Sequence, residues 1–351
     1  MKRALLSLVF LGLVGGFLRA AEAPLRPKVV VVAMFEPGRD TGDEPGEFQF
    51  WVEREKLDKI YPLPSAYHDV RSNADGSVIG IVTGVGAVRA AATIMALGSD
   101  PRFDLSKSYW LVAGIAGIDP AKGSLGSAVW ANWLVDGSLN HQIDAREMPP
   151  DWPTGYVPLS KKKPYEQPRD PKDEAVAFQL DAGLVNWAYV LTKDVKLDDT
   201  PLMQKRRADY VGFPNAQRPP FVLKGDNLTT LTYWHGKLMN AWANAWVNYY
   251  TDGRGSYVTT AMEDTGTAQA LTWLTRAGRA DVRRLLVLRT ASNFDMQWRG
   301  ATAAESLFGG KIPHFSAYIA SLEAAHRVGS VVVHELVSGW ARYEQALPPG
   351  K

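Results

Sequence analysis

Short runs of β-branched and other apolar residues, each closed by a turn-rich or glycine-rich loop, constrain the fold of this chain more than any other feature. Runs of this length and composition are typical of buried strands. Segments with helical spacing lie between them at 88–97 and 266–277, and helices close the chain near 315–326 and 330–345. This alternation predicts an α/β fold with one sheet flanked by helices. The strand-like runs lie at 28–34, 77–83, 108–113, 127–135, 221–226, 256–262 and 284–290.

One irregular stretch interrupts the alternation. Residues 149–171 hold seven of the 22 prolines of the chain, which is more irregular chain than a strand-to-helix connection needs. We therefore predict an irregular Pro-rich insertion over about residues 145–222 within a single domain of residues 24–351. After the prolines, apolar residues at helical spacing from Val176 to Leu191 predict a helix.

A stripe of large apolar residues marks a further helix. Leu238, Trp242 and Trp246 recur four residues apart, which puts them on one helical face. We expect this face to be buried against the sheet, with a sugar-binding platform as the alternative.

The first 23 residues have the pattern of a signal peptide. Lys2 and Arg3 precede an apolar run from Ala4 to Leu18, and small residues follow up to Ala23. We expect export to the periplasm or an equivalent space, with a retained N-terminal anchor as the alternative. After residue 23 no stretch approaches the roughly 18–20 apolar residues that span a bilayer, so we expect no transmembrane span in the mature chain.

Composition excludes several classes of protein. With no Cys, the chain has no disulfide scaffold, thiolate metal site or Cys nucleophile. Residues 1–23 hold three basic residues and one acidic residue, so their removal takes 39 Lys and Arg and 37 Asp and Glu to 36 of each. A neutral chain has no electrostatic footprint for phosphate backbones, and we expect no nucleic-acid partner. The six His lack metal-ligand spacing. Dinucleotide and Walker-type glycine patterns are missing too, so we expect no metal and no cofactor.

Candidate site residues follow the predicted strands, because ligands of open α/β sheets bind at the carboxyl ends of strands. These positions offer polar acceptors, acids and glycines that expose the backbone, but no nucleophile–base triad. His141 joins them because it lies in the polar segment after the fourth predicted strand. The candidates are Glu36, Gly84, Gly86, Gly114, Gly117, His141, Asp226, Asn227, Thr229, Thr230, Glu263, Asp264, Ser292, Asn293 and Asp295.

Six motifs in order resemble those of the purine nucleoside permease family, whose sequences look like distant relatives of the nucleoside phosphorylases and nucleosidases. The resemblance runs through nearly all of the mature chain. It implies a single nucleoside phosphorylase-like domain with a mixed central sheet, a purine nucleoside as ligand and a part in nucleoside uptake. It leaves a homo-oligomer open. The motifs are Ala33-Met-Phe-Glu36, Val82-Thr-Gly-Val-Gly-Ala-Val88, Ala113-Gly-Ile-Ala-Gly117, Gly225-Asp226, Met262-Glu-Asp-Thr-Gly266 and Arg289-Thr-Ala-Ser-Asn293.

The resemblance also implies roles for single residues in binding. In this superfamily, glycine loops bring backbone amides close to the ribose. The acid after Met262 takes the ribose hydroxyls, which fits Glu263, since a carboxylate accepts two O–H hydrogen bonds at once. One extra residue before Gly266 leaves Asp264 as the alternative.

The position after Ser292 would act at N7 of the purine. Many relatives have Asp there and protonate N7, but this chain has Asn293. An amide cannot be a general acid, although it can stabilise charge on the departing base by hydrogen bonding, unless Asp295 supplies the proton. Arg39 and Arg89 make no convincing phosphate pair. We therefore predict hydrolysis of the N-glycosidic bond with Asn293 and Asp295 as catalytic residues, or a non-catalytic nucleoside-capture or interaction module.

Overall fold

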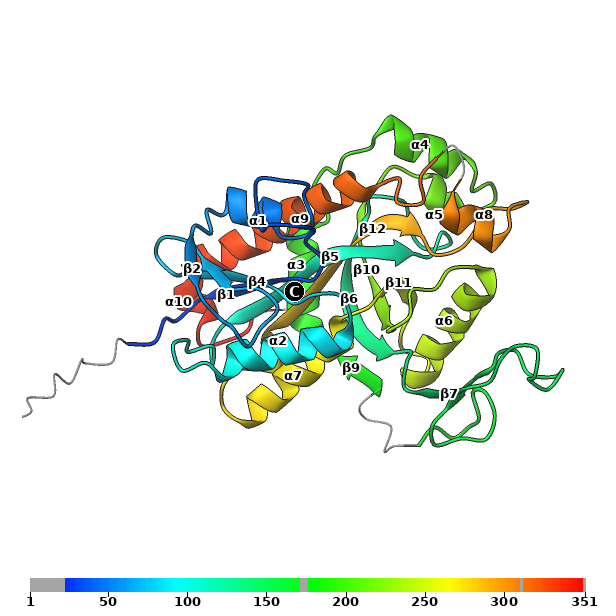
Figure 1. The fold of residues 1–351 in the computed structure, drawn as a ribbon, viewed down its shortest axis with the longest axis horizontal. Coiled ribbons are helices and arrows are strands. Elements are labelled where there is room, and N and C mark those ends of the chain that lie inside the picture. The colour runs from blue at the N-terminus through cyan, green and yellow to red at the C-terminus, as the bar shows by residue number, and fades with distance from the viewer. Residues whose placement is uncertain (1–22, 171–175, 310–311, 350–351) are drawn as a thin grey trace, which may run out of the picture.

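A computed structural model describes residues 23–170, 176–309 and 312–349 (Figure 1). The predicted signal peptide lies outside these residues except for Ala23. Within the described ranges, a sheet of ten strands has the order β11-β10-β6-β12-β5-β1-β4-β3-β2, and β9 pairs with β6. The strands are β1 (Val29–Ala33), β2 (Lys59–Tyr61), β3 (Val70–Ser72), β4 (Val78–Val82), β5 (Tyr109–Ile118), β6 (Ala128–Asp136), β9 (Ala177–Gln179), β10 (Val222–Thr229), β11 (Tyr257–Ala261) and β12 (Leu285–Phe294).

The sheet is mixed and partly closed. The pairs β1–β4, β1–β5, β5–β12, β6–β10 and β10–β11 are parallel, whereas β12–β6 is antiparallel. β11 also pairs with β5, so β5, β12, β6, β10 and β11 form a ring. Shifts in register at Gly225/Asn227 and Ala291/Asn293 mark bulges, which bend the strands that close this ring. The predicted mixed sheet is confirmed.

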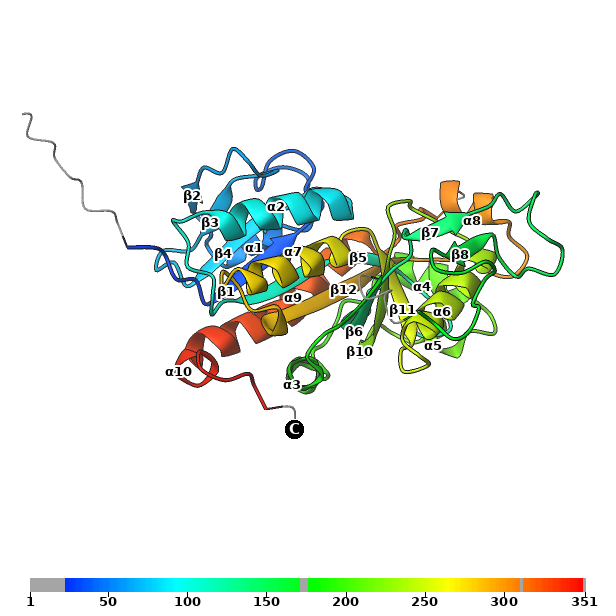
Figure 2. The same cartoon turned by 90° about the horizontal axis from the view of Figure 1, so that it is seen from below.

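Helices cover the sheet on both sides (Figures 1 and 2). In Figure 1, α2 and α7 lie together on one side, and α1 and α9 lie together on the other. Close packing depends on glycines, because a Cβ at Gly98 of α2 would lie 2.2 Å from Cδ1 of Leu274 in α7. The helices are α1 (Gln49–Arg54), α2 (Ala87–Ser99), α3 (Ala182–Thr192), α4 (Pro201–Ala208), α5 (Pro214–Gln217), α6 (Lys237–Tyr250), α7 (Asp264–Arg276), α8 (Ala303–Phe308), α9 (Tyr318–Ser338) and α10 (Trp340–Tyr343), with the 3-10 turn η2 (Val282–Arg284).

Three predicted helices have different bounds in the structure. The helix expected from Val176 begins at Ala182, because Asp181 caps it by accepting a hydrogen bond from the Leu184 N–H at 2.8 Å, and the preceding residues form β9. The two helices expected near the C-terminus are largely one, α9. Gly329 lies inside α9 and does not interrupt it. Glycine is required here for packing, because a Cβ at this position would lie 2.9 Å from the Trp51 ring.

The tryptophan stripe of α6 is buried, as predicted. Trp242 and Trp246 are 3% and 0% exposed, whereas Leu238 points to solvent. Tyr156, in a small hairpin of β7 (Asn140–Gln142) and β8 (Tyr156–Pro158), packs on Trp242 with ring centroids 4.6 Å apart. Residues 145–222 contain β8, β9 and helices α3 to α5, so this stretch contributes both a strand and helices to the domain.

Candidate active site

A cavity of about 520 Å³ opens where the carboxyl ends of β1, β5, β11 and β12 meet, within the usual size range of ligand sites. Most of its wall is apolar or aromatic, and the loop after β10 adds Thr230, Tyr233 and Trp234. The loop before α9 adds Phe315 and the start of α9 adds Tyr318. Four charged side chains line the cavity, namely Glu44, Glu47, Glu263 and Arg289. A ligand with one polar end and one flat apolar part would match this division.

Arg289 organises the charged end. It lies in β12, is 1% exposed, and donates through Nη2 to Glu263 at 2.9 Å and to Asp264 at 2.5 Å. Its Nη1 donates to the Ile115 carbonyl at 3.0 Å. The carboxylates of Asp264 and Glu263 raise the pKa of this guanidinium against the effect of burial. Glu263 lines the cavity and Asp264 does not, so the geometry distinguishes these two neighbouring candidates.

Glu47 shares this end of the cavity and is 5% exposed. Its Oε2 accepts hydrogen bonds from the backbone N–H groups of Met34 and Phe35 at 2.8 and 2.9 Å. Its Oε1 accepts from the N–H of Ile115 at 2.7 Å. Burial raises the pKa of Glu47 to about 7, against the opposing effect of Arg289 and with a further rise from Glu263. A carboxyl group with this pKa exchanges a proton readily near neutral pH.

Glu36 builds the loop that carries Glu47. Its two carboxylate oxygens accept hydrogen bonds from the backbone N–H groups of Gly46, Phe48 and Gln49 at 2.6–2.9 Å. Burial raises the pKa of Glu36, and these three bonds oppose the rise. Glu36 was predicted to bind substrate, but it does not line the cavity, because its oxygens face its own loop.

Ser292 and Asn293 line the cavity at the end of β12. Asn293 donates through Nδ2 to the Phe294 carbonyl at 3.0 Å and accepts at Oδ1 from the Ser292 hydroxyl at 2.9 Å. The strand register sets Asn293 beside Gly117, which also lines the cavity. An amide offers two N–H groups and two lone pairs, and the Asn293 side chain also meets the Tyr233 hydroxyl, so a ligand at its second N–H would replace that contact.

Asp295 points away from the cavity. It accepts from the Tyr257 hydroxyl at 2.5 Å and from the Asn240 amide at 3.1 and 3.2 Å, and it is 1% exposed. Burial, with a smaller effect of Asp119, raises its pKa to about 8. The geometry therefore gives no support to the predicted catalytic role of Asp295. Side chains alternate between the two faces of a strand, but β12 ends at Phe294, so this alternation does not extend from Asn293 to Asp295.

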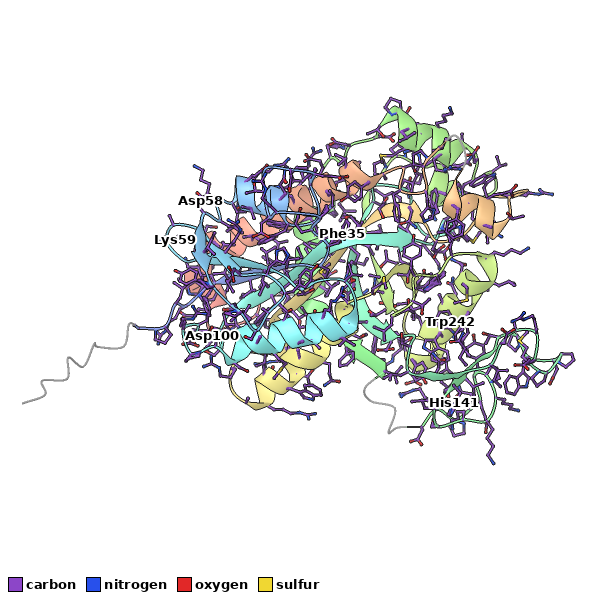
Figure 3. The ribbon with its side chains drawn as sticks, in the orientation of Figure 1. Phe35, Asp58, Lys59, Asp100, His141 and Trp242 are labelled. Atoms are coloured by element: carbon purple, nitrogen blue, oxygen red, sulfur yellow. The ribbon has the colours of Figure 1, made fainter. Side chains whose placement is uncertain are left out.

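Other candidates also lie outside the cavity wall. His141 is exposed on β7, on the peripheral hairpin and well away from Phe35 (Figure 3), and its Nε2 faces the Leu159 carbonyl. Asp226 accepts from the backbone N–H groups of Trp133 and Ser256 and so joins β10 to its neighbours. Neither residue lines the cavity that Asn293 lines.

Most of the predicted glycines do not line the cavity but lie next to residues that do. Gly86 donates its N–H to Glu263 at 3.1 Å, and Gly84 takes a φ of 79° that suits glycine. Gly114 leaves room for Glu47, because a Cβ there would lie 2.6 Å from the Glu47 Oε1. Only Gly117 among the four predicted glycines lines the cavity itself.

Several residues of the site were not assigned from the sequence. Arg289 stands in the quoted motif before Asn293, and its place on a buried strand was a usable signal. Glu47 lies in a turn-rich acidic stretch with no local signal that separates it from Glu44. Tyr233, Phe315 and Tyr318 reach the cavity from loops and a helix start, which local patterns do not assign to a site.

Among residues 23–170, 176–309 and 312–349, no group of three or more His, Asp or Glu side chains is arranged to hold a metal ion. Within that part of the chain, no helix is long and apolar enough to cross a bilayer.

Comparisons with known proteins agree with this geometry. The family model described as "Purine nucleoside permease" matches residues 26–348. A purine nucleoside permease of Candida albicans is 29% identical over 90% of this chain and 76% of its own length. The Schizosaccharomyces pombe protein described as a "probable purine nucleoside permease" is 29% identical over 90% of both chains.

Solved structures show the same fold. A 5'-methylthioadenosine/S-adenosylhomocysteine nucleosidase of Streptococcus pneumoniae, solved with a transition-state inhibitor, aligns with a TM-score of 0.51 and 15% identity, covering 88% of this chain and 97% of that one. The corresponding nucleosidase of Colwellia psychrerythraea, in complex with adenine, aligns with a TM-score of 0.50 and 17% identity, covering 89% and 95%. The predicted nucleoside phosphorylase-like fold is confirmed.

Proposed function

This chain belongs to the purine nucleoside permease family, and we propose that it binds a purine nucleoside in the cavity and hydrolyses its N-glycosidic bond. One observation carries the proposal: buried Glu47, Glu263 and Arg289 gather at one end of a largely apolar cavity that Asn293 also lines. The permease names of the relatives support a nucleoside ligand. The nucleosidases that share the fold support cleavage.

The charged end suits the ribose. Glu263 uses Oε1 for the Gly86 N–H and Oε2 for Met262 N–H and Arg289. A carboxylate has about four lone-pair sites, so one remains to accept a ribose O–H. Arg289 holds this carboxylate in position, because the ion pair is buried and Arg289 is shared with Asp264.

The reaction uses water. The C1'–N9 bond breaks and its electron pair goes to the purine, while a water oxygen bonds to C1'. Glu47 accepts the proton that this water loses, and the departing base takes a proton from solvent, so charge and atoms balance. Asn293 donates its remaining N–H to the base as negative charge grows there.

Non-catalytic capture of nucleosides is the second candidate, and one observation favours it. One N–H of the Asn293 amide already donates to Phe294 and its oxygen accepts from Ser292, and an amide cannot protonate a leaving base. Binding and cleavage use the same cavity.

A direct assay separates the two candidates. Purified protein is incubated with inosine and with adenosine, with and without phosphate, and free base is measured by chromatography. We expect release of base that does not depend on phosphate, with Glu263→Ala as the inactive control. Reversible binding of a nucleoside without release of base over long incubation would leave capture as the function.

We also propose that the chain is exported and takes part in nucleoside uptake. The charged start and single apolar run of residues 1–23 support this. Cell fractionation with intact-mass analysis tests it, and a full-length chain recovered from the cytoplasm would contradict it.

A further inference from the structure

We infer that Glu47 is a built-in anion, which occupies a cradle of backbone N–H groups that would otherwise take a small oxyanion from solution. The site thereby uses water, and not phosphate, as the acceptor of the ribosyl group. The second statement rests on the proposed hydrolysis, whereas the first concerns the cradle alone.

The cradle is formed by two neighbouring parallel strands. The N–H groups of Met34 and Phe35, just past β1, and of Ile115 in β5 all point at the Glu47 carboxylate, at 2.7–2.9 Å. Three converging backbone donors are a typical anion site. Arg289 fixes one wall, because it donates to the carbonyl of the same Ile115.

Gly114 leaves the space that the Glu47 carboxylate occupies. A Cβ on Gly114 would lie 2.6 Å from the Glu47 Oε1 and 2.7 Å from its Cδ. Any side chain at position 114 would therefore intrude on the anion. Glycine here leaves the cradle open to a planar carboxylate of this size.

The loop holds its shape without the Glu47 side chain. Glu36 binds the N–H groups of Gly46, Phe48 and Gln49, and the backbone N–H of Glu47 donates to the Phe35 carbonyl at 2.7 Å. Truncation of Glu47 should thus empty the cradle without releasing the loop that surrounds it.

The charge balance selects the anion. Arg289 already has two carboxylate partners, Glu263 and Asp264, so the region is net negative even without Glu47. A singly charged anion then binds more easily than phosphate dianion. Formate suits the test, because it supplies the carboxylate group that Glu47→Ala removes together with Cγ and is small enough to enter the cradle.

The experiment adds sodium formate to Glu47→Ala, with sodium chloride at equal ionic strength as the reference. We expect formate to raise the melting temperature of this variant and to restore part of the turnover, which loss of the proton acceptor lowers by about a hundredfold or more. Wild type should not respond. Glu44→Ala is the matched control, because Glu44 belongs to the same loop and lines the cavity but is exposed. It should not respond to formate either.

Glu47→Gln separates occupation of the cradle from the negative charge of the side chain that occupies it. Its side chain keeps the volume, so the cradle stays occupied and formate should give no rescue. A folded Glu47→Ala that formate neither stabilises nor reactivates would overturn the inference, and so would a wild-type turnover that rises with phosphate. If Glu47→Ala folds only in the presence of formate, this result supports the cradle. If Glu47→Ala never folds, the inference is tested by whether the turnover of wild type depends on phosphate.

Failure of the proposed function has a different signature. If wild type releases no base, the hydrolysis is wrong, but stabilisation of Glu47→Ala by formate still reports on the cradle.

Discussion

In the proposed function, Glu263 and Asn293, at the ends of β11 and β12, recognise different parts of the nucleoside. Glu263 belongs to a network of buried charges with Arg289, whereas Asn293 is a neutral amide on the same cavity. A charged acceptor suits hydroxyl donors, and an amide suits the edge of a base. Each assignment gives a separate measurement.

Replacement of Glu263 by Ala should weaken nucleoside binding far more than binding of the free base. Loss of a hydrogen bond to a charged group costs roughly 1.5–3 kcal/mol, about a ten- to hundredfold change in affinity. Calorimetry with inosine and hypoxanthine measures both. Asp264→Asn is the neighbouring control, because Asp264 is buried behind Arg289 and should lower stability without separating the two ligands. Equal losses for nucleoside and base in Glu263→Ala would reassign Glu263.

Replacement of Asn293 by Ala should lower turnover by roughly a hundredfold or more, by analogy with loss of one oxyanion donor, with a modest change in affinity. The reason is that charge on the base grows only as the bond breaks. Asn293→Asp should retain activity with a more acidic optimum, since its carboxyl donates only when protonated. Steady-state kinetics over a range of pH check both variants. A fall in affinity with turnover unchanged for Asn293→Ala would indicate a binding role alone.

At the scale of elements, the loop from β1 to α1 is the part that completes the site. Glu36 folds it back on itself, and its second half then carries Glu47 to the ends of β1 and β5. β5 accepts this loop only because Gly114 lacks a side chain. The position of this loop therefore depends on Gly114 in β5.

Substitution of Gly114 by Ala should lower both stability and turnover. The new Cβ would lie 2.3 Å from the Met34 Cε and 2.6 Å from the Glu47 Oε1, and overpacking of this kind costs about 1–3 kcal/mol. Gly117→Ala on the same strand is the comparison, because its nearest neighbour would be 3.1 Å away, so a smaller loss of stability is expected. Urea unfolding measures both variants. Equal stability of Gly114→Ala and wild type would show that Glu47 can move without cost.

At the scale of the whole molecule, ring closure brings distant parts of the chain together. Thr260 pairs with Gly117 across the β11–β5 contact, and Asn293 pairs with Gly117 on the other side. The same closure buries acids deeply. Burial raises the pKa of Glu47 to about 7 and that of Asp295 to about 8, so stability becomes sensitive to pH.

We expect the free energy of unfolding to fall as pH rises from about 6.5 to 8. In this window folded Asp295, and below about pH 7 folded Glu47 as well, still hold protons that the unfolded chain has lost. The folded state therefore binds more protons and the slope is negative, with about 1 kcal/mol per pH unit from Asp295. His235 and His314, whose pKa values burial lowers to about 4, have the opposite effect only below about 6.5. Urea unfolding at several pH values measures the slope.

The matched variants are Asp295→Asn and Asp252→Asn. The first removes the group with the higher pKa and should reduce the slope, most clearly near pH 8, where Glu47 has lost most of its proton. The second changes a more exposed acid whose pKa the Arg169 partner lowers, so it should leave the slope unchanged. A wild-type stability that rises through this window would contradict the burial of Asp295 in its protonated form.

Periodicity and glycine loops are local properties of the chain, so they were enough to predict the fold class and the central strands, and the six ordered motifs indicated the family. Local composition also identified the strands that Glu263, Ser292 and Asn293 follow or end, which made these residues candidates. Three-dimensional contacts were needed to see that Glu36 holds a loop, that Asp295 and His141 lie away from the cavity, and that Glu47 lies in it. Those outcomes depend on partners such as the Ile115 N–H, which is 68 residues from Glu47. No local pattern encodes strand register or loop return, and these set which buried groups meet.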